Sequence, residues 1–327
     1  MRSGADGAFW CLLLLLAVAE LLAQPAALRQ VVADSDWLAA AEFVRARHRP
    51  GDLIVAAPAW TDPLVRWSIG DKIDLPDAGR SDLSRYRRLW SLSVRGARAE
   101  EAPAAAPELR QRVGKVTVER WALPEPRVLY DFAEHLRAAR VSMESRGGRH
   151  DCPWVRARAA RGGGLGKDSL RPPEHFACDP KRPWLWVAPI VMEDLNLKPR
   201  YCVWQHPAGK RPVRVSFDDV LLGDALVLYG GLYYHHERKR RGGPVHVRLF
   251  VDDADVGRMI HQDGDGWKRL EVPLEAQVGR THARIAIEVT APRPYHRSFC
   301  WAASMRGQAR SNAAAAGKRR GAEGLGE

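Results

Sequence analysis

The chain has 327 residues, of which 46% are hydrophobic and 28% are charged. This length can supply two domains with separate cores, and this composition excludes a wholly disordered chain. The formal net charge of +12 would suit a polyanionic partner. Because basic residues are spread along the whole sequence rather than clustered, we interpret the charge as a generally basic surface and expect no nucleic-acid partner.

Residues 1–27 form an apolar N-terminal segment, in which one arginine precedes a run from Ala8 to Ala27. The small residues of "AVA" are typical of signal-peptide cleavage after Ala19, with an alternative site after Ala23. The run is also about long enough for an uncleaved membrane anchor, and a wrongly assigned start is a third interpretation. A signal peptide or an anchor would place the rest of the chain in the periplasm or outside the cell.

A helix is predicted next, over "DSDWLAAAEFVR", with Ser35 or Asp36 as its N-cap. Pro50 and Gly51 end this pattern before the next element. The residues with helical spacing on its apolar face are Trp37, Ala40, Ala41 and Val44.

The apolar run "DLIVAAP" predicts a strand that is buried on both faces of a mixed or parallel sheet. Further strands are predicted over 87–96 and 113–121, so residues 30–125 are expected to form a small α/β domain. Ligands of α/β sheets gather beyond the carboxyl ends of strands, so Trp60 and Asp62 in "PAWTDP" mark a candidate pocket. The simpler interpretation of Asp62 is a loop aspartate that caps local backbone.

At "WLAAAEFVRARHRPGDLIVAAPAWTDPLVRW" the sequence resembles the extracytoplasmic tail of polytopic, lipid-phosphate-sugar-dependent glycosyltransferases of the protein mannosyltransferase type. In that family a last transmembrane helix leads into a helix, a Pro-Gly-Asp turn and an apolar strand, as from Trp37 to Pro58 here. The resemblance covers about residues 8–125 and implies a periplasm-facing domain near the membrane. The family's catalytic acidic residues lie in an early loop among membrane helices, so no catalytic residue carries over.

Cysteine usage agrees with export, since an even number of cysteines follows Cys11. In an exported chain this number is typical of disulfides, with three possible pairings. We predict that Cys152–Cys178 closes a loop and that Cys202–Cys300 joins the opening and closing strands of one β domain. The sequence has no C-x-x-C motif, and we expect neither a metal nor a cofactor.

Residues 126–183 are expected to be a linker and a long loop. Helical spacing over 128–143 competes with a strand at both ends, and 144–183 is rich in Arg, Gly and Pro. We expect this part to be a partly disordered loop held by one disulfide. The segment "RGGGLGKD" (161–168) is not a phosphate loop, because arginine and aspartate replace its required glycine and Ser/Thr.

Residues 184–306 show period-2 alternation in seven short runs separated by turn residues. This pattern predicts an antiparallel β-sandwich, most simply a jelly roll, and gives the chain an α+β fold class. Residues 307–327 lack a core pattern and are expected to be a disordered tail. The faces predicted to be buried include Val245, Val247, Leu249 and Val251 in one run, and Ala283, Ile285, Ile287 and Val289 in another.

The stretch "HQDGDGWKRLEVPL" (261–274) could be a metal loop, a sugar platform or a turn. An EF-hand fails because its twelfth position lacks glutamate, whereas Asp-Gly between alternating runs favours a hairpin turn. Alternation places Trp267 with Arg269 on the wetter face, where an indole can stack on a sugar, unless a bulge returns Trp267 to the core. A calcium site is the weaker alternative, with the candidate ligands Asp252, Asp253, Asp263 and Asp265.

The densest basic cluster lies in "YYHHERKRRGG" (233–243). A solvated hairpin loop is the simpler interpretation. The alternative is an anion site for phosphate or uronate, because arginine forks match these groups. Zinc binding by His235 and His236 is disfavoured, since neighbouring side chains on a strand point to opposite faces. The cations of the cluster are Arg238, Lys239, Arg240 and Arg241.

Residues 200–306 resemble the galactose-binding-like jelly rolls that occur as carbohydrate-binding modules. The residues that carry the resemblance are the acidic turn and Trp267 in "DGDGW", and the terminal strands bearing Cys202 and Cys300. The resemblance implies a sandwich that binds glycan, although jelly rolls host many functions.

Our leading hypothesis is an exported or membrane-tethered, non-catalytic protein whose sandwich binds glycan or an envelope protein. The expected ligand-facing residues are Trp267, Arg269, Arg238, Arg240 and Arg241. Two alternatives remain open at this point. One is an accessory or detached part of a glycosyltransferase acting on lipid-linked sugars, with Asp62 or Asp71 in a pocket. The other is a structural envelope assembly factor. The sequence has no G-x-S-x-G or H-E-x-x-H motif, which disfavours an enzyme.

Overall fold

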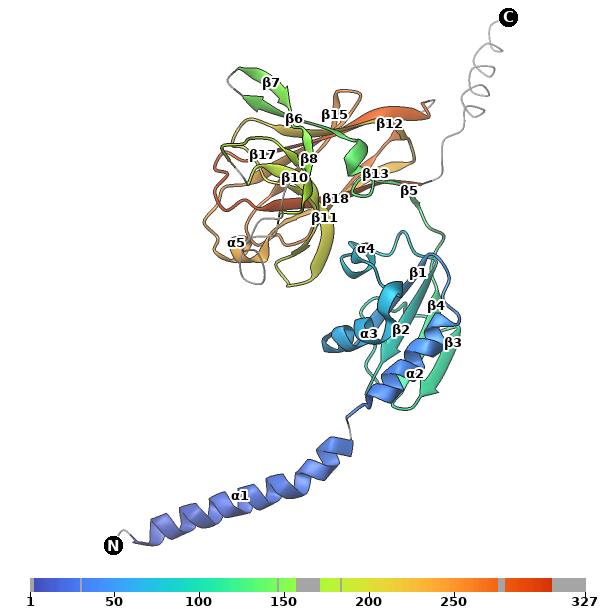
Figure 1. Cartoon of the computed structure of the whole chain (residues 1–327), viewed down its shortest axis with the longest axis vertical. Coiled ribbons are helices and arrows are strands. Elements are labelled where there is room, and N and C mark those ends of the chain that lie inside the picture. The colour runs from blue at the N-terminus through green and yellow to red at the C-terminus, as the bar shows by residue number, and fades with distance from the viewer. Residues whose placement is uncertain are drawn as a thin grey trace, which may run out of the picture. The chain divides into compact units, whose positions relative to one another are not determined.

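A computed structural model describes residues 3–29, 31–145, 147–156, 171–182, 184–275 and 280–307. The chain divides into two compact units (Figure 1). The N-terminal unit comprises residues 1–73 and 87–123, and the C-terminal unit comprises 74–86 and 124–327. The "RGGGLGKD" segment and almost all of the predicted tail lie outside the described residues.

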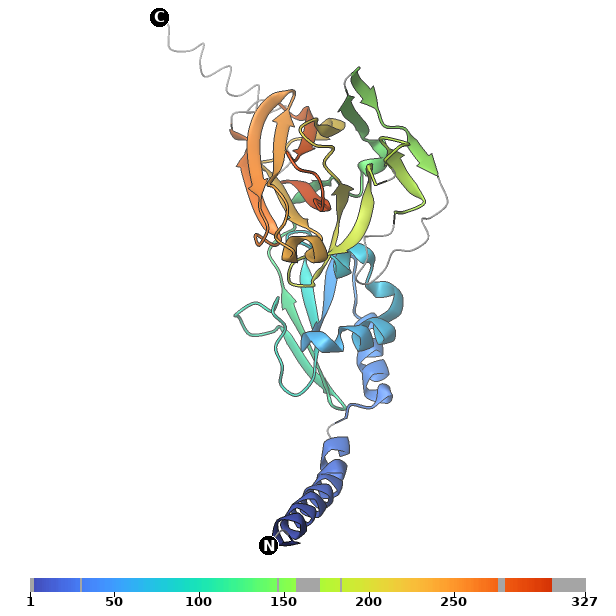
Figure 2. The ribbon, with the colours of Figure 1, turned by 90° about the vertical axis from the view of Figure 1, so that its left-hand side faces the viewer.

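The N-terminal unit is a sheet with helices on one face. Its described strands lie in the order β1-β2-β4-β3, with β1 and β2 parallel and the other neighbours antiparallel. Helices α2 and α3 pack against this sheet, and Figure 2 shows both on the same side of it. The elements are α1 (Ser3–Arg29), α2 (Asp34–Arg45), β1 (Asp52–Ala57), η1 (Ala59–Thr61), α3 (Asp62–Ile69), η2 (Gly70–Lys72), β2 (Arg88–Ser93), β3 (Leu109–Val113) and β4 (Val116–Ala122).

Helix α2 packs as the sequence predicts, but its cap differs. Trp37 and Val44 are both buried in the core of this unit, together with Ala40 and Ala41 between them. The predicted caps are wrong, because Ala33 holds the N-cap position without a side-chain hydrogen bond. The carboxylate of Asp36 instead accepts a hydrogen bond from the backbone of Lys115 at 3.1 Å. Asp36 therefore joins the helix to the β3–β4 turn, a long-range contact that local spacing does not reveal.

The N-terminal helix α1 covers the predicted apolar segment, and its side chains from Phe9 to Leu22 are mostly exposed. Among the described residues, no helix combines the length and the hydropathy needed to cross a membrane.

The C-terminal unit is a β-sandwich. Within the described residues its larger sheet has the order β16-β13-β18-β11-β10-β9-β8, with β5 also pairing with β18, and its smaller sheet has the order β15-β14-β17-β12-β6-β7. The elements are α4 (Leu75–Ala78), β5 (Val128–Asp131), η3 (Leu136–Ala138), β6 (Arg140–Ser145), β7 (Gly148–Asp151), β8 (Trp154–Arg156), β9 (Glu174–Ala177), β10 (Trp186–Glu193), β11 (Pro199–Gln205), β12 (Val213–Leu221), β13 (Ala225–Leu232), α5 (Tyr234–Arg238), β14 (Val245–Val251), β15 (Ala254–His261), β16 (Lys268–Pro273), β17 (His282–Thr290) and β18 (Phe299–Arg306).

The strands from β11 to β18 have jelly-roll topology. One sheet contains β11, β18, β13 and β16 as neighbours, and the other contains β12, β17, β14 and β15. This is the strand arrangement of a jelly roll. The predicted alternation is confirmed, since Val247 on β14 and Ile287 on β17 are fully buried between the sheets. The antiparallel sandwich predicted from period-2 runs is therefore the fold of this unit.

The segment expected to be a linker and long loop contains strands instead. Its described parts include β6, which pairs with β12 from Val213↔Met143 to Ser216↔Arg140, and β5, which pairs with β18. These strands pair with partners far along the chain and are short, so their own sequences show little periodicity. Both predicted disulfides are confirmed, Cys152–Cys178 and Cys202–Cys300, and the second joins β11 to β18, the opening and closing strands of the jelly roll.

Residues 74–86 belong to the jelly-roll unit, although the chain on both sides of them belongs to the other unit. The backbone N–H of Tyr201 on β11 donates to the carbonyl of Gly79 at 2.7 Å. A Cβ atom at Gly79 would lie 2.2 Å from the nitrogen of Tyr201, so glycine allows this close approach. The Arg200 guanidinium donates to the carbonyl of Arg80 at 2.8 Å. We name residues 74–86 the insertion segment.

Candidate functional site

Four loops of the jelly roll meet at one end of the sandwich. The strand register brings the end of β11 beside the start of β18 (Trp204↔Cys300) and the end of β15 beside the start of β14 (Val245↔His261). Helix α5 lies at this end (Figure 1). We name this surface the loop end and define it by the segments 206–212, 233–244, 262–267 and 291–298, which follow β11, β13, β15 and β17.

Exposed cations gather at the loop end. In the part of the chain that the structure describes, no carboxylate forms an ion pair with any of them. The Arg238 guanidinium lies 5.3 Å from the ring centroid of Tyr234. The cations are Lys210, Arg211, Arg238, Lys239, Arg240, Arg241 and Arg293.

The acidic side chains of the loop end are engaged within the protein. Glu237 is buried and accepts hydrogen bonds from the backbone of Gly264 at 3.1 Å and of Gly266 at 2.8 Å. Burial raises the pKa of Glu237, an effect that these two N–H donors oppose. Asp265 forms an ion pair with Lys268 at 3.0 Å. The "DGDG" stretch is therefore a turn whose backbone N–H groups are bound by the buried carboxylate of Glu237.

A buried arginine holds two loops of this surface together. The guanidinium of Arg297 is inaccessible to solvent and lies 2.7 Å from the carboxylate of Asp263. It also donates to the carbonyl of Gly243 at 3.3 Å. A Cβ atom at Gly242 would lie 1.9 Å from the Arg297 guanidinium carbon, so only glycine fits at this position. Segments 233–244 and 291–298 are thereby locked to each other.

Exposed aromatic rings accompany these cations. Tyr295 is 78% exposed, and its ring centroid lies 3.9 Å from that of His296. The His296 ring lies 4.7 Å from His236, which connects Tyr295 to α5. Trp184 is 50% exposed and precedes β10, whose first residues pair with the end of β11 at the same end of the sandwich. The loop end thus presents aromatic rings and cations together.

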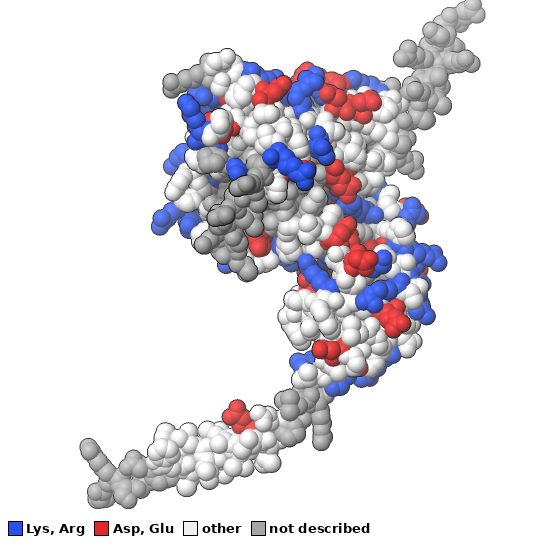
Figure 3. All heavy atoms as spheres, in the orientation of Figure 1, with Lys and Arg blue, Asp and Glu red and all other residues white. Residues whose placement is uncertain are grey.

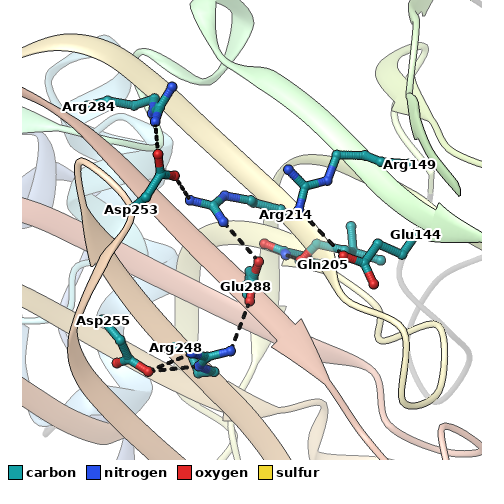
Figure 4. A network of polar contacts seen from close by, with 10 residues as sticks. Glu144, Arg149, Gln205, Arg214, Arg248, Asp253, Asp255, Arg284 and Glu288 are labelled. Carbon is teal, nitrogen blue, oxygen red and sulfur yellow. Dashed lines mark hydrogen bonds and ion pairs between the residues drawn. The ribbon is translucent and has the colours of Figure 1, made fainter.

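The outer face of the smaller sheet differs from the loop end, because its arginines form ion pairs with carboxylates. Arg214 lies between Asp253 at 2.9 Å and Glu288 at 3.1 Å, and Arg248 pairs with Asp255 at 2.8 Å (Figure 4). On the face of the jelly-roll unit seen in Figure 3, basic and acidic side chains are likewise interspersed. Each arginine of this network thus has at least one carboxylate partner.

The calcium site that was the weaker alternative for the stretch 261–274 does not form, because its four aspartates do not come together. Asp252 and Asp253 lie between β14 and β15, at the end of the sandwich opposite Asp263 and Asp265. Asp253 pairs with Arg214 and Asp263 with Arg297. Across the described ranges, no group of His, Cys, Asp and Glu side chains could hold a metal ion.

Trp267 ends segment 262–267 of the loop end and packs against the same buried cluster as Tyr234, whereas Arg269 lies further along, on β16. Trp267 is half-buried on the outer face of the larger sheet, where its indole N–H donates to the Ser81 hydroxyl at 3.1 Å. A Cβ atom at Gly231 would lie 2.8 Å from this indole, so glycine makes room for it. Arg269 is exposed and pairs with Glu271. Alternation correctly places Trp267 outside the sandwich core, but the insertion segment contacts it there.

A small polar pocket lies between the insertion segment and the larger sheet. It has a volume of about 50 Å³, which holds a few water molecules at ~10–15 Å³ each. Burial raises the pKa of Tyr229, and the neighbouring Asp82 carboxylate adds to this effect. The charged and phenolic lining of the pocket includes Arg80, Asp82, Arg85, Asp131, Tyr201, Tyr229 and Arg306.

The candidate pocket of the N-terminal unit contains an ion pair. Asp62 begins α3 and lies 2.6 Å from the Arg66 guanidinium, one turn further along the helix. Asp71 is exposed and lies 3.5 Å from Lys72. Trp60 is 61% exposed beside the Arg95 guanidinium. Asp62 and Asp71 each therefore have a nearby cation of the same segment as a partner.

Sequence reasoning singled out Arg238, Arg240 and Arg241 and missed the other members of the loop end. Tyr295 and Arg293 stand in "APRPYHRS", which has no motif, and Lys210 with Arg211 stand in a second short loop. Their common position depends on jelly-roll connectivity. They could have been predicted by assigning every strand of the jelly roll, because this topology brings alternate loops to the same end of the sandwich.

No family model and no curated protein matches the sequence. Several solved structures have a similar fold over part of the chain. CBM51-2 with GlcNAc and the INT domains of Clostridium perfringens ZmpB is 14% identical, with 52% of this chain and 37% of that chain covered and a TM-score of 0.29. The tandem CBM51 modules of Sp3GH98 from Streptococcus pneumoniae SP3-BS71 are 12% identical, with 37% of each chain covered and a TM-score of 0.30.

A third similar structure is CBM51 of Clostridium perfringens GH95 in complex with methyl-galactose, which is 10% identical, with 36% of this chain and 79% of that chain covered and a TM-score of 0.25. The present chain spans 37% of the length of the first two structures. TM-scores at this level do not relate individual sites of two proteins.

Proposed function

We propose that this chain is an exported, non-catalytic protein whose jelly roll binds glycan through the loop end. The observation that carries this proposal is the juxtaposition of an exposed aromatic ring, Tyr295, with exposed cations that have no carboxylate partner among the described residues. Aromatic rings stack on the apolar faces of sugars, while guanidinium and ammonium groups donate hydrogen bonds to their oxygens.

The scaffold suits a binding surface carried on loops. The disulfide Cys202–Cys300 ties β11 to β18 directly beneath the loop end, and Arg297 locks two of the loops from inside. Loops held on a rigid sandwich lose less entropy on binding than free loops do. The proposed binding residues are Arg238, Arg240, Arg241, Arg293 and Tyr295.

Disulfides and the N-terminal helix support export. Two disulfides form and persist in oxidising compartments, which include the periplasm and the extracellular space. We propose that α1 directs export, either as a cleaved signal peptide or as a tether. Intact mass of the protein from fractionated cells tests this point: a mature start near Glu20 or Gln24 shows cleavage, and full-length protein in the membrane fraction shows a tether.

A glycan panel tests the proposed function. The purified chain is expected to be retained on at least one polysaccharide, and Tyr295→Ala is expected to weaken retention about tenfold by removing the stacking ring. Tyr295→Phe keeps the ring and serves as the matched control, for which retention should persist. Absence of retention on every glycan, with the protein folded, would refute glycan binding.

A protein partner in the envelope is a second candidate, favoured by an exposed stripe on the N-terminal unit. Trp60 is 61% exposed and Trp67 is 56% exposed, and Leu64 lies one helical turn from each of them. Contiguous exposed apolar surface of this kind marks protein contacts. Stoichiometric co-purification of one protein, lost in Trp67→Ser and kept in Tyr295→Ala, would support this candidate and separate it from glycan binding.

A further inference from the structure

We infer that the glycan bound at the loop end carries negative charge, as uronate carboxylates or as phosphate groups. This inference rests on the proposed function and narrows its ligand. It follows from the imbalance of charge at one end of the jelly roll. The exposed cations there have no carboxylate partner among the described residues, whereas Glu237, Asp263 and Asp265 are held by backbone N–H groups or by other cations.

The charge of the loop end contrasts with that of the neighbouring sheet. On the smaller sheet, Arg214 lies 2.9 Å from the carboxylate of Asp253, and Arg248 lies 2.8 Å from that of Asp255 (Figure 4). Both distances are typical of charge-assisted hydrogen bonds. At the loop end, the run Arg238–Arg241 has no such partner within the described residues. Neighbouring cations without counter-charges repel one another and raise the local positive potential, which attracts an anion.

The acids that could neutralise this run cannot reach it. Glu237 precedes Arg238 directly, yet its side chain is buried and accepts the backbone hydrogens of Gly264 and Gly266. Asp263 is turned toward Arg297, with an oxygen 2.7 Å from that buried guanidinium. The fold therefore uses its local carboxylates to hold the loops, and the exposed cations have no carboxylate partner within the described part of the chain.

The backbone presents these cations outward in a fixed arrangement. Helix α5 ends at Arg238, and Arg240 has a φ of +48°, in the left-handed region that non-glycine residues rarely adopt. Such a conformation persists where the surrounding structure enforces it, and it is frequent at functional sites. Gly242 then passes within contact distance of Arg297, which anchors the turn. The exposed run Arg238–Arg241 is therefore followed by a glycine that packs against the buried Arg297.

The chemistry of the side chains specifies the ligand class. A guanidinium presents paired N–H donors that match the two oxygens of a carboxylate or phosphate, and charge-assisted bonds of this type are stronger than those to hydroxyl groups. Tyr295 supplies a ring for the sugar itself. A glycan with repeated anionic groups offers the cations of the loop end charged partners, whereas a neutral glycan offers them hydroxyl groups alone.

The experiment compares charged and neutral forms of the same backbones. The purified full chain is titrated calorimetrically with oligogalacturonate and its methyl ester, and with a phosphorylated mannan and its dephosphorylated form. We expect one charged form to bind at least about tenfold more tightly than its neutral counterpart. We also expect this difference to shrink at high ionic strength, since salt screens exposed charges. The uronate and phosphate arms identify which anion is recognised.

A charge-reversal pair with a matched control completes the test. Arg240→Glu with Arg241→Glu should abolish the preference for the charged form. Arg140→Glu with Arg258→Glu makes the same change in net charge at two highly exposed arginines outside the loop end, and should leave the preference intact. Circular dichroism and thermal unfolding of both double variants establish that each is folded.

The outcomes separate this inference from the proposed function. Equal affinity for charged and neutral forms, sensitive to Tyr295→Ala, overturns the anionic ligand while glycan binding stands. Binding to neither form of any glycan overturns both. Binding to anionic phospholipid vesicles in place of glycans also overturns the inference, because it assigns the cations to a lipid surface.

Discussion

Tyr229 on β13 donates its hydroxyl hydrogen to the carboxylate of Asp82 across 2.7 Å, although the two residues lie 147 positions apart in the sequence. Asp82 also pairs with Arg306 on β18 at 2.7 Å. These contacts, with those of Trp267 to Ser81 and Arg200 to Arg80, fix the insertion segment to the outer face of the larger sheet. A segment from the N-terminal half is thus part of the jelly-roll unit.

Asp82→Asn is expected to destabilise the C-terminal unit by about 1–3 kcal/mol, because a mostly buried Arg306 loses its counter-charge. Thermal and urea unfolding of the full chain measure the change. Asp224→Asn, on a nearby turn, does not serve as a control because its side chain has contacts of its own. Asp218→Asn is the better choice, because Asp218 is exposed and forms a long ion pair with the exposed Arg140 at 3.7 Å. Loss of such a surface pair should change stability little.

The lowered pKa of Asp82 predicts that the C-terminal unit loses stability in acid. Burial alone would raise the pKa of Asp82, but the Arg306 guanidinium and hydrogen bonds from Ser84 and Tyr229 outweigh it and hold the pKa below 3.8. A lowered folded-state pKa contributes stability that is present above the unfolded pKa and is lost as the pH falls through the folded pKa. Stability should therefore fall below about pH 4, and Asp82→Asn should flatten that part of the curve. An unchanged acid limb in the variant would contradict this assignment.

Glu237 should show the opposite pH dependence. Its raised pKa, caused chiefly by burial, means that the protonated form suits the fold, and the stability it contributes is lost as the pH rises through the folded pKa. Glu237→Gln keeps an acceptor for Gly264 and Gly266 and should match or exceed the natural protein in melting temperature at pH 8. Glu237→Ala leaves both backbone donors without their acceptor and should cost about 2–4 kcal/mol. A Gln variant as unstable as the Ala variant would show that the charge itself is needed.

Gly242→Ala should destabilise the loop end. Its Cβ atom would lie 1.9 Å from the guanidinium carbon of buried Arg297, so a loop or the arginine must move. Overpacking of this kind costs about 1–3 kcal/mol. Gly243→Ala is the matched control, because its nearest neighbour is the Arg293 guanidinium at 3.6 Å, an ordinary contact. Equal melting temperatures for both variants would contradict the packing described around Arg297.

The two disulfides should contribute unequally. Cys202–Cys300 spans 98 positions and Cys152–Cys178 spans 26. In the chain-entropy account a longer closed loop restricts the unfolded chain more, with about 4–5 kcal/mol expected near 100 residues and about 3 kcal/mol for much shorter loops. Paired Cys→Ser variants, compared by urea unfolding, measure this order. A larger loss from the Cys152–Cys178 pair would show that folded-state contacts outweigh loop entropy.

The features that repeat locally could be predicted from the sequence. Alternation identified the buried faces of β14 and β17, helical spacing identified the packed face of α2, and cysteine number and position led to both disulfides. These signals work because burial on one face of a helix or strand imposes a short period on the residues of that element. The jelly-roll class followed from the number and spacing of such runs.

Which distant residues meet could not be predicted from the sequence and became known from the folded structure. The insertion segment looks like part of its neighbours in sequence, and nothing local indicates that Asp82 contacts Tyr229. The turn "DGDG" is fixed by Glu237 from another loop, and Tyr295 reaches the basic run because jelly-roll connectivity gathers alternate loops at one end. Such contacts depend on strand order and register, which bring together segments far apart in the chain and leave no periodic trace in either of them.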